Sequence, residues 1–274
     1  MQIAIQGELG SFSHEAALKF QSRATLFPCA ISAEVFAALD DGRAEAAVIP
    51  IENSLAGSVS EHYDLLLAHD VAIERELLLR IRHNLIAVPG TRLDQVQRVY
   101  SHPVALAQCR RFFESHPEVE AIPYYDTAGS VKQLMELRDR TSAGIASVQA
   151  ALHYGGEVLQ TGIEDNPENY TRFFFIQRRS EARTDPAADK VSLAFTVENR
   201  PGTLVEALQV FASQGTNLTR IESRPVHGQP WHYVFYADYQ LSSTLSADAA
   251  LQLLGHHCSM VKELGRYRAG QRED

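Results

Sequence analysis

A chain of 274 residues, 45% of them hydrophobic, is long enough to form two globular domains. Its formal net charge of −9 argues against nucleic acid as a partner, because phosphate backbones are bound by clustered Lys and Arg. No apolar run reaches the roughly 18 residues of a membrane span, and the N-terminus lacks the basic flank and apolar core of a signal peptide. We therefore expect a cytoplasmic protein without membrane contact, whose three cysteines are reduced thiols.

The first part of the chain alternates between predicted strands and helices. Short apolar runs predict strands at residues 3–6, 46–50, 99–100, 145–146 and 173–176. Apolar residues at helical spacing, each set preceded by a hydroxyl side chain, predict helices that begin near residues 11–13, 32, 101–103, 127 and 147. The third of these is expected to be one continuous helix with a buried stripe of Ala105, Cys109 and Phe112. This alternation predicts an α/β domain with largely parallel sheets.

The predicted catalytic domain, residues 1–178, divides into two lobes with a cleft between them. Residues 76–160 repeat the strand–helix plan and form one lobe, and residues 1–75 plus 161–178 form the other, since the strand at 173–176 returns to it. The fold class is that of two-lobed proteins like the periplasmic binding proteins. Residues 179–189 are polar, contain a proline and show no apolar period, which is typical of a linker.

Residues 190–274 form a second, smaller domain. Strands are predicted at 191–198, 217–226, 231–240 and 261–267, helices at 201–214 and 246–257, and a tight turn at 227–230. The order β-α-β-β-α-β is that of a ferredoxin-like unit.

Hydroxyl side chains recur where a helix follows a strand, at Ser11 or Ser13, Ser101, Thr127 and Ser147. Each one alone is explained by N-capping, which stabilises a helix by about 1 kcal/mol. In α/β sheets, however, these turns meet at the carboxyl ends of the strands, where ligands bind. Several helix N-termini that face one cleft would bind an anion through hydroxyl and backbone N–H groups.

Two further segments carry polar residues beside a strand. Residues 50–59 (PIENSLAGSV) follow a buried strand, and residues 169–173 (NYTRF) precede an aromatic one. Because side chains alternate along a strand, Thr171 would point into the cleft and Arg172 would brace its wall. The alternatives are a capped turn in the first segment and, in the second, an edge-strand threonine beside a surface arginine. Neither a dinucleotide nor a P-loop motif is present, and no histidines have metal-ligand spacing, so no cofactor or metal is expected.

Five motifs in series resemble the prephenate dehydratase family. They are residues 7–17 (GELGSFSHEAA), 50–59, 101–109 (SHPVALAQC), 126–128 (DTA) and 169–173, and residues 201–205 (PGTLV) and 217–225 (NLTRIESRP) resemble an ACT domain. Thr203 stands where the ACT motif usually has alanine, and Gly129-Ser130 stand where alanines are usual in the dehydratases. Because no helical mutase segment precedes Met1, the resemblance is to the monofunctional form.

The resemblance implies a lyase that converts prephenate to phenylpyruvate with loss of water and carbon dioxide, in phenylalanine biosynthesis. Thr171 would orient or relay the proton for the departing ring hydroxyl, since a threonine hydroxyl is a weak acid. The implied catalytic residues are Thr171, Arg172 and Phe173. The implied substrate-binding residues are Ser11, Glu52, Asn53, Ser54, Ser101, Gln108 and Thr127.

The ACT resemblance implies regulation by phenylalanine, bound at an ACT–ACT interface of a homodimer or homotetramer. Backbone N–H groups of the ACT domain, at the start of a helix, would bind the effector's carboxylate. Residues 222–225 would transmit the effect of this binding to the catalytic domain. The implied effector-binding residues are Gly202, Thr203, Leu204, Val205, Asn217, Leu218, Glu222, Ser223, Arg224 and Pro225.

Two other functions stay open on the sequence alone. Arogenate dehydratase would act on the aminated analogue of prephenate through the same motifs. A non-catalytic, amino-acid-sensing binding protein would also suit a two-lobed cleft joined to a small sensor domain.

Overall fold

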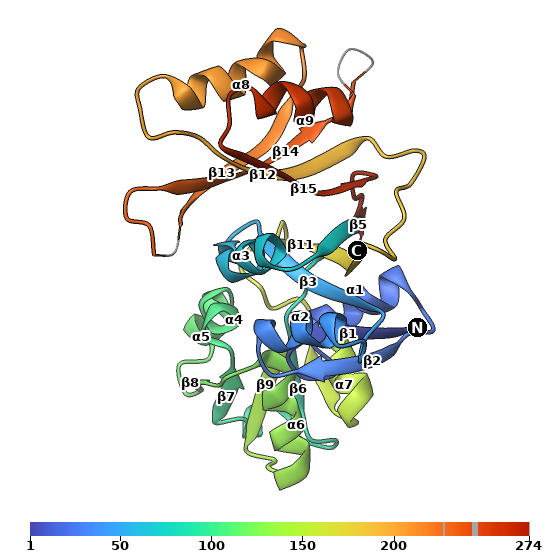
Figure 1. The fold of residues 1–274 in the computed structure, drawn as a ribbon. Helices are drawn as coiled ribbons and strands as arrows, with labels where there is room; N and C mark the ends of the chain where they lie inside the picture. Colours follow the sequence, from blue (N-terminus) through green and yellow to red (C-terminus); the bar gives the residue numbers. More distant parts are fainter. Residues whose placement is uncertain (227, 243–245, 274) are drawn as a thin grey trace. The chain divides into compact units, whose positions relative to one another are not determined.

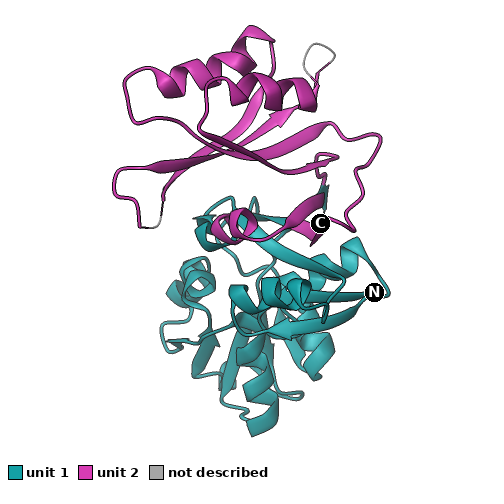
Figure 2. Ribbon diagram, in the orientation of Figure 1, with its two compact units in different colours: residues 1–62, 77–173, 272–274 teal, residues 63–76, 174–271 magenta. Residues whose placement is uncertain are grey.

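The computed structural model describes residues 1–226, 228–242 and 246–273, which form two compact units (Figure 2). Unit 1 comprises Met1–His62, Leu77–Phe173 and Arg272–Asp274, and unit 2 comprises Tyr63–Glu76 and Phe174–Gln271. Strands β5 (Val71–Arg80) and β11 (Tyr170–Arg178) each contribute residues to both units. The predicted domain bounds, 1–178 and 190–274, place Tyr63–Glu76 differently and remain predictions.

The first lobe of unit 1 is a sheet of strands that neighbour one another in the order β11-β3-β1-β2 (Figure 1). Strands β1 (Gln2–Gln6), β2 (Thr25–Cys29) and β3 (Ala46–Asn53) are parallel; β1 and β3 were predicted, whereas β2 was not. Helices α1 (Phe12–Phe20) and α2 (Ser32–Asp40) pack on them, and the short β4 (Gly57–Ser58) turns back against the end of β3. β11 neighbours β3, and the predicted assignment of residues 161–178 to this lobe stays a prediction.

The second lobe of unit 1 is a sheet with the order β10-β6-β9-β7-β8. Its strands are β6 (Asn84–Ala87), β7 (Arg98–Ser101), β8 (Glu120–Pro123), β9 (Ser142–Ala146) and β10 (Glu157–Gln160). β7 pairs in parallel with β8 and β9, whereas β6 pairs antiparallel with β9 and β10. Its helices include η1 (Leu93–Gln95), α6 (Thr127–Leu137) and α7 (Val148–Tyr154). The two-lobed α/β prediction is confirmed.

The predicted third helix is in fact two helices, so the expectation of one continuous helix was wrong. Helix α4 (Pro103–Ala107) ends before Gln108, and α5 (Arg110–Ser115) starts after Cys109. The carboxylate of Asp165 accepts the backbone N–H groups of Arg110 and Arg111, at 2.9 Å each, and so caps α5. The cap lies more than fifty positions away along the chain, which explains why local spacing missed the break. The predicted stripe is nevertheless buried as expected.

Unit 2 contains the predicted ferredoxin-like arrangement. Strands β12 (Lys190–Thr196), β13 (Leu218–Pro225), β14 (Tyr233–Gln240) and β15 (Met260–Tyr267) have the antiparallel order β13-β14-β12-β15. Helices α8 (Thr203–Ser213) and α9 (Ala247–Gly255) cover one face of this sheet (Figure 1). The predicted turn at 227–230 includes His227, which lies outside the described residues. The pair β16 (Arg272–Glu273) and β5 belongs to unit 1.

Unit 2 also holds most of α3 (Ser60–Ala68) and the start of β5. The ammonium group of Lys262 donates to the carbonyls of Leu66, Leu67 and His69, at 3.2, 2.7 and 2.8 Å. A helix leaves its last carbonyls without intrahelical partners, and a cation there also favours the helix dipole. Lys262 of β15 therefore stabilises the C-terminal end of α3.

A buried ion pair in unit 2 gives a testable stability effect. The ammonium group of Lys190 lies 2.9 and 3.0 Å from the carboxylate oxygens of Glu76, and the two side chains are only 11% and 2% exposed. Removing one partner leaves a buried charge without its counter-ion, so we expect Glu76→Leu or Lys190→Met alone to lower the free energy of unfolding by about 3–5 kcal/mol. The double variant is expected to lose less than either single variant in urea titrations. A double variant that loses the sum of both effects would contradict this account.

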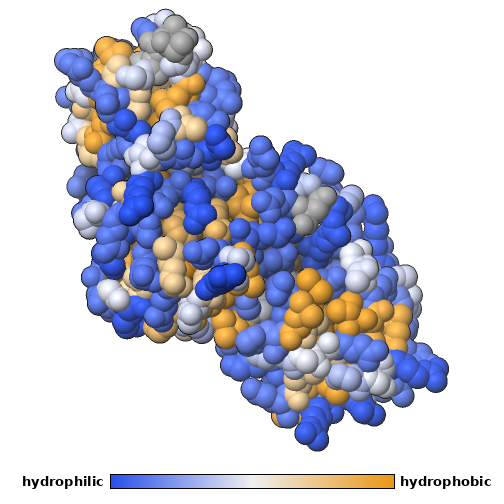
Figure 3. Space-filling model, turned by 90° about the vertical axis from the view of Figure 1, so that its right-hand side faces the viewer, coloured by the Kyte–Doolittle hydropathy of each residue, from blue (hydrophilic) through white to orange (hydrophobic). Residues whose placement is uncertain are grey.

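Hydrophilic side chains cover most of the face drawn in Figure 3, with hydrophobic patches between them. Across the described parts of the chain, no helix combines the length and the apolar character needed to cross a bilayer.

Candidate active site

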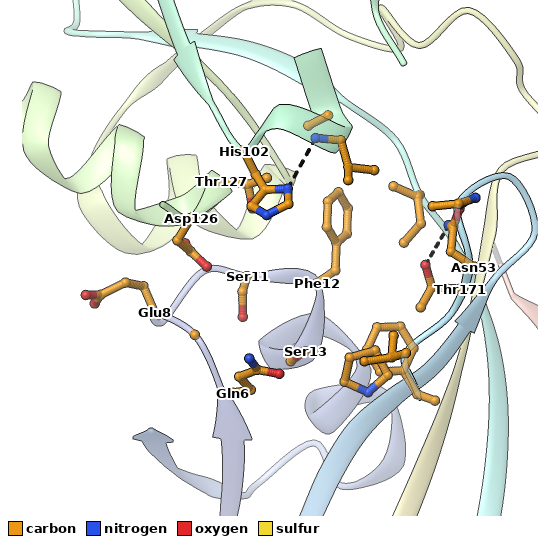
Figure 4. A pocket seen from close by; sticks show the side chains of 18 of the residues that line it. Gln6, Glu8, Ser11, Phe12, Ser13, Asn53, His102, Asp126, Thr127 and Thr171 are labelled. Atoms are coloured by element: carbon orange, nitrogen blue, oxygen red, sulfur yellow. Dashed lines mark hydrogen bonds between the residues drawn. The ribbon is translucent and has the colours of Figure 1, made fainter. Parts of the chain in front are cut away.

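A cavity of about 690 Å³ lies in unit 1 and receives residues from both lobes (Figure 4). The first lobe supplies the end of β1, the start of α1, the segment after β3 and the start of β11. The second lobe supplies the starts of α4 and α6. The polar side chains that line the cavity are Gln6, Glu8, Ser11, Ser13, Asn53, Ser58, His83, His102, Gln108, Tyr125, Asp126, Thr127 and Thr171.

The N-terminal ends of α1, α4 and α6 contribute residues to this cavity, although α6 is capped by Asp126 and not by the predicted hydroxyl of Thr127. Ser11 caps α1 by accepting the N–H of His14 at 3.3 Å, and Asp126 caps α6 by accepting the N–H of Gly129 at 2.7 Å. Among the described residues that line the cavity there is no lysine or arginine. An anion bound here would therefore meet helix termini and neutral donors, beside the carboxyl groups of Glu8 and Asp126. Ser147, by contrast, is buried and its hydroxyl donates to the carbonyl of Gly10 at 2.6 Å.

The side chain of Asn53 fixes the hydroxyl of Thr171. The amide oxygen of Asn53 accepts the N–H groups of Leu55 and Ala56, at 3.0 and 2.8 Å, so its amide nitrogen must face β11. That nitrogen donates to the hydroxyl oxygen of Thr171 at 2.9 Å (Figure 4). The Thr171 hydroxyl is thus an acceptor towards Asn53, and its own proton remains to be donated to another group. Thr171 lines the cavity and is 9% exposed.

Several of the predicted substrate-binding and catalytic residues line the cavity and others do not. Ser11, Asn53, Gln108, Thr127, Thr171 and Phe173 are all on its wall. Ser101 is fully buried and its hydroxyl donates to the carbonyl of Ile145 at 2.6 Å, which ties β7 to β9. Glu52 and Arg172 also lie outside the lining.

The hydrogen bonds of Ser54 join two segments of the backbone. Its hydroxyl donates to the carbonyl of Glu168 at 3.1 Å and accepts the N–H of Tyr170 at 3.0 Å. Its own N–H also donates to the carbonyl of Tyr170 at 2.8 Å. Ser54 therefore holds the segment after β3 against the start of β11, where Thr171 follows.

Several polar lining residues were not selected from the sequence, among them Glu8, His83, His102 and Asp126. Glu8, His102 and Asp126 lie inside the motifs quoted above, so the motifs were the available signal. The Nδ1 atom of His102 accepts the N–H of Val104 at 3.3 Å. Burial raises the pKa of the Asp126 carboxyl, although the N–H of Gly129 opposes this shift.

His62 lies behind the cavity and gives a prediction of pH dependence. It is fully buried, and its Nδ1 atom lies 2.5 Å from the carbonyl oxygen of Pro50, which itself lines the cavity. Burial lowers the pKa of this imidazole. The unfolded chain therefore binds a proton more readily, so stability from the neutral ring is present above about pH 6.5 and is lost as the pH falls below that value.

We expect wild-type protein to lose roughly 1–2 kcal/mol more unfolding free energy between pH 7 and pH 5 than His62→Asn does. Asparagine keeps a donor near the Nδ1 position but does not titrate. His257, which is exposed, provides the matched control, and His257→Gln should show the wild-type pH dependence. Urea titrations at each pH measure the difference, and equal slopes for wild type and His62→Asn would refute the assignment.

A second cavity of about 180 Å³ lies in unit 2 at the start of α8. The predicted effector residues Gly202, Thr203, Leu204 and Val205 line it, together with Trp231 and Tyr233, which the sequence did not single out. Gly202 is the N-cap of α8 with φ at 91°, a conformation that glycine adopts readily. The predicted residues Asn217, Leu218, Glu222, Ser223, Arg224 and Pro225 lie outside this lining, on β13 or just before it.

A two-lobed α/β unit with hydroxyl and helix-terminal donors around one cavity, combined with a ferredoxin-like unit, defines a ligand-binding protein of the α/β class with an added small domain. Comparison with known families makes this specific: the family model for prephenate dehydratase matches residues 3–181, and that for the ACT domain matches residues 191–238. The chain belongs to the prephenate dehydratase family, which consists of hydro-lyases.

Curated relatives are similar over 97% of this chain. An arogenate dehydratase/prephenate dehydratase 2 of Arabidopsis thaliana is 37% identical over 278 residues, which is 72% of its length. A bifunctional chorismate mutase/prephenate dehydratase of Aquifex aeolicus is 35% identical over 270 residues, which is 73% of its length.

Two solved structures each match 98% of this chain. The prephenate dehydratase of Arthrobacter aurescens in complex with L-Phe has 34% identity, a TM-score of 0.89 and 90% of its own chain covered. A protein described as a novel type of quorum quenching acylase has 33% identity, a TM-score of 0.91 and 98% of its chain covered.

Proposed function

We propose that this protein converts prephenate to phenylpyruvate in phenylalanine biosynthesis. Membership of the family supports the reaction, and one geometric observation supports the role of the site. Asn53 holds the Thr171 hydroxyl as an acceptor at 2.9 Å, which leaves the Thr171 proton free to be donated on the cavity wall.

In the proposed reaction the ring carboxylate leaves as neutral carbon dioxide, and its bonding electron pair enters the ring. The bond between the ring and its hydroxyl oxygen then breaks, and that oxygen takes up a proton and leaves as water. Aromatisation of the ring drives both steps. Thr171 supplies or relays the proton to the departing oxygen, and solvent restores it, because a threonine hydroxyl is too weak an acid to act as a permanent proton source.

The absence of lysine and arginine from the described cavity lining suits this chemistry. A cation bound to the departing carboxylate would stabilise a negative charge that is lost in the transition state, and so would slow the reaction. Neutral donors hold a carboxylate with less penalty when its charge disappears. We propose Ser11, Asn53, Gln108 and Thr127 as the substrate-binding residues, with Phe173 packing against the ring.

We propose a supporting role for the other predicted site residues, which are Glu52, Ser54, Ser101 and Arg172. They lie outside the cavity lining, so we propose that they support the residues that do line it. Ser54 and Ser101 have explicit structural hydrogen bonds for this role.

The direct test is to incubate the purified chain with prephenate and to measure phenylpyruvate by its absorbance in alkali. Turnover of prephenate at a kcat/KM well above that for arogenate is the expected result. The Arabidopsis relative is named for both activities, so arogenate conversion to phenylalanine is measured in parallel. A preference for arogenate would assign the second activity, and ligand binding without turnover would assign a non-catalytic binding protein. The structural neighbour described as a quorum quenching acylase adds one further assay, for hydrolysis of an N-acylated quorum signal.

We also propose that phenylalanine binds at the start of α8 and regulates the enzyme. The related structure in complex with L-Phe supports the choice of effector. The cavity offers the N-terminus of an 11-residue helix for the carboxylate and Leu204, Val205 and Trp231 for the aromatic ring. The proposed contribution of residues 217–218 and 222–225 comes from β13, which lies at the edge of its sheet.

A homodimer or homotetramer is the proposed assembly. β13 is an edge strand, and an uncovered edge presents N–H and C=O groups that pair readily with a second copy. The proposed location is the cytoplasm, and the three free cysteines, Cys29, Cys109 and Cys258, agree with a reducing compartment.

A further inference from the structure

We propose that His83 is a positioning residue of the active site: its ring holds the amide oxygen of Gln108, so that the amide nitrogen of Gln108 is turned to a carboxylate of the substrate. This inference rests on the proposed dehydratase function and extends it to a residue that neither the motifs nor the comparisons assign. The support is a network of five polar side chains whose donor and acceptor directions can be followed from one end to the other.

The network begins at the backbone. The N–H groups of Leu55 and Ala56 can only donate, so the side-chain atom of Asn53 that meets both must be its oxygen. The amide nitrogen of Asn53 is then fixed on the other side, where it donates to the side-chain oxygen of Asn169 at 2.8 Å and to the hydroxyl oxygen of Thr171 at 2.9 Å. The oxygen and nitrogen of the Asn53 side-chain amide therefore cannot swap positions.

The direction set at Asn53 passes to Gln108. Since Asn169 accepts through its oxygen, its amide nitrogen must face the opposite way, and there it donates to the oxygen of Gln108 at 3.0 Å. Asn169 is fully buried, so its orientation is not averaged by water. The side-chain oxygen of Gln108 therefore faces Asn169 and His83. Its side-chain nitrogen is then the polar atom that can donate to a ligand.

His83 completes the network as a donor. Its Nε2 atom lies 2.8 Å from the oxygen of Gln108, which can only accept, so Nε2 carries the proton. Its Nδ1 atom is buried and has no hydrogen-bond partner among the described residues, which fits an unprotonated nitrogen. Burial lowers the pKa of this imidazole, which agrees with a neutral ring.

The ring of His83 is held firmly enough to act as a support. It is 2% exposed and makes an edge contact with the ring of Phe12, at 5.7 Å between centroids. The backbone N–H of His83 donates to the carboxylate of Glu164 at 2.9 Å, and its backbone carbonyl accepts the N–H of Ile163 at 2.9 Å. A donor fixed in this way restricts Gln108 to one orientation before the substrate arrives, which reduces the entropy lost on binding.

The same network therefore orients two hydrogen-bond donors on the cavity wall. The network turns the Gln108 amide nitrogen and the Thr171 proton away from its own members, and both residues line the cavity. Because prephenate carries two carboxylates and a ring hydroxyl, we assign a carboxylate to Gln108 and the hydroxyl to Thr171. His83 therefore affects substrate binding, through Gln108, more than it affects turnover.

The test uses His83→Leu, which keeps the bulk and removes the donor, and His83→Gln, which restores a donor near the Nε2 position. His83→Leu should raise KM for prephenate roughly tenfold or more, with kcat changed by less than about threefold, as expected for loss of one hydrogen bond to a charged group. His83→Gln should recover most of that loss. The exposed His153 gives the matched control, and His153→Leu should leave both constants unchanged.

A double variant and a spectroscopic measurement separate the possible failures. If His83 acts through Gln108, His83→Leu/Gln108→Ala should have the KM of Gln108→Ala alone, and multiplied effects would overturn the inference. A KM within twofold of wild type for folded His83→Leu would overturn it as well. Independently of turnover, ¹⁵N shifts of the His83 ring at pH 7 should report a neutral Nε2–H tautomer. A wild-type protein that releases no phenylpyruvate refutes the proposed function, whereas an Nδ1–H or doubly protonated ring refutes the network itself.

Discussion

Replacing Thr171 with alanine is expected to lower kcat for prephenate by about 10²–10³-fold, because general acid assistance to a leaving group typically contributes 10²–10⁴-fold. The structure makes the effect specific to the hydroxyl. Asn53 occupies its acceptor side at 2.9 Å, so the only proton that this side chain can offer is available on the cavity wall. Initial rates of phenylpyruvate release measure the change.

Thr171→Ser keeps the hydroxyl and is expected to remain within about tenfold of wild-type kcat, since Asn53 can still direct its oxygen. Thr171→Val keeps the shape, removes the proton donor and leaves the Asn53 nitrogen with one partner fewer. It should therefore resemble Thr171→Ala in turnover, with a loss of about 1–3 kcal/mol in stability. Near-wild-type turnover by folded Thr171→Ala would show that the departing hydroxyl receives its proton elsewhere.

Local signals in the sequence predicted many of the elements, but not strands β2, β5, β6, β8 and β10 or helix α3. The helices α1, α2, α6 and α7 begin where a hydroxyl or proline pattern and an apolar period coincide. Both determinants act within a few residues, so they can be read from a short window. The ferredoxin-like order was recoverable for the same reason, since each of its strands and helices has its own period.

Contacts between distant residues decided what the sequence did not reveal. Asp165 caps α5 from across the chain, so the spacing of Ala105, Cys109 and Phe112 was consistent with one helix although two are present. Side-chain pairs such as Lys190 with Glu76 join segment 63–76 to the C-terminal strands within unit 2. No local period reports such pairs.

The motifs located the site but did not distinguish between its residues. Ser101 and Thr127 both stand at helix starts after a strand, yet the hydroxyl of Ser101 is bound to the carbonyl of Ile145 and Thr127 lines the cavity. His83 carries no motif, and its place follows from hydrogen bonds to Gln108 and Glu164 that link positions 25 and 81 apart. The direction of a side chain therefore had to come from the structure.

Regulation is expected to depend on the ion pair between Arg224 and Asp64. Arg224 of β13 donates to the carboxylate of Asp64 on α3 through two nitrogens, at 2.9 and 2.6 Å, and Asp64 is 53% exposed. An exposed pair contributes at most about 1 kcal/mol to stability, so Asp64→Asn should leave the melting temperature nearly unchanged. Its geometry is nonetheless bidentate, which fixes the position of α3 relative to β13 within unit 2.

We expect Asp64→Asn to raise the phenylalanine concentration for half-maximal inhibition about 5–30-fold while kcat without effector stays near wild type. Along the chain α3 follows β4, and β4 pairs with the end of β3 at Asn53, so a shift of α3 has a short covalent route to the residue that orients Thr171. An effector inhibits only if it binds the less active state more tightly, and such coupling is typically about 1–3 kcal/mol.

The exposed pair of Asp248 with Arg266 supplies the matched control, and Asp248→Asn should keep the wild-type midpoint. The charge-reversed double variant Asp64→Arg/Arg224→Asp should restore part of the sensitivity, because it rebuilds the pair in the opposite order. If Asp64→Asn is inhibited at the wild-type concentration, β13 does not communicate through α3.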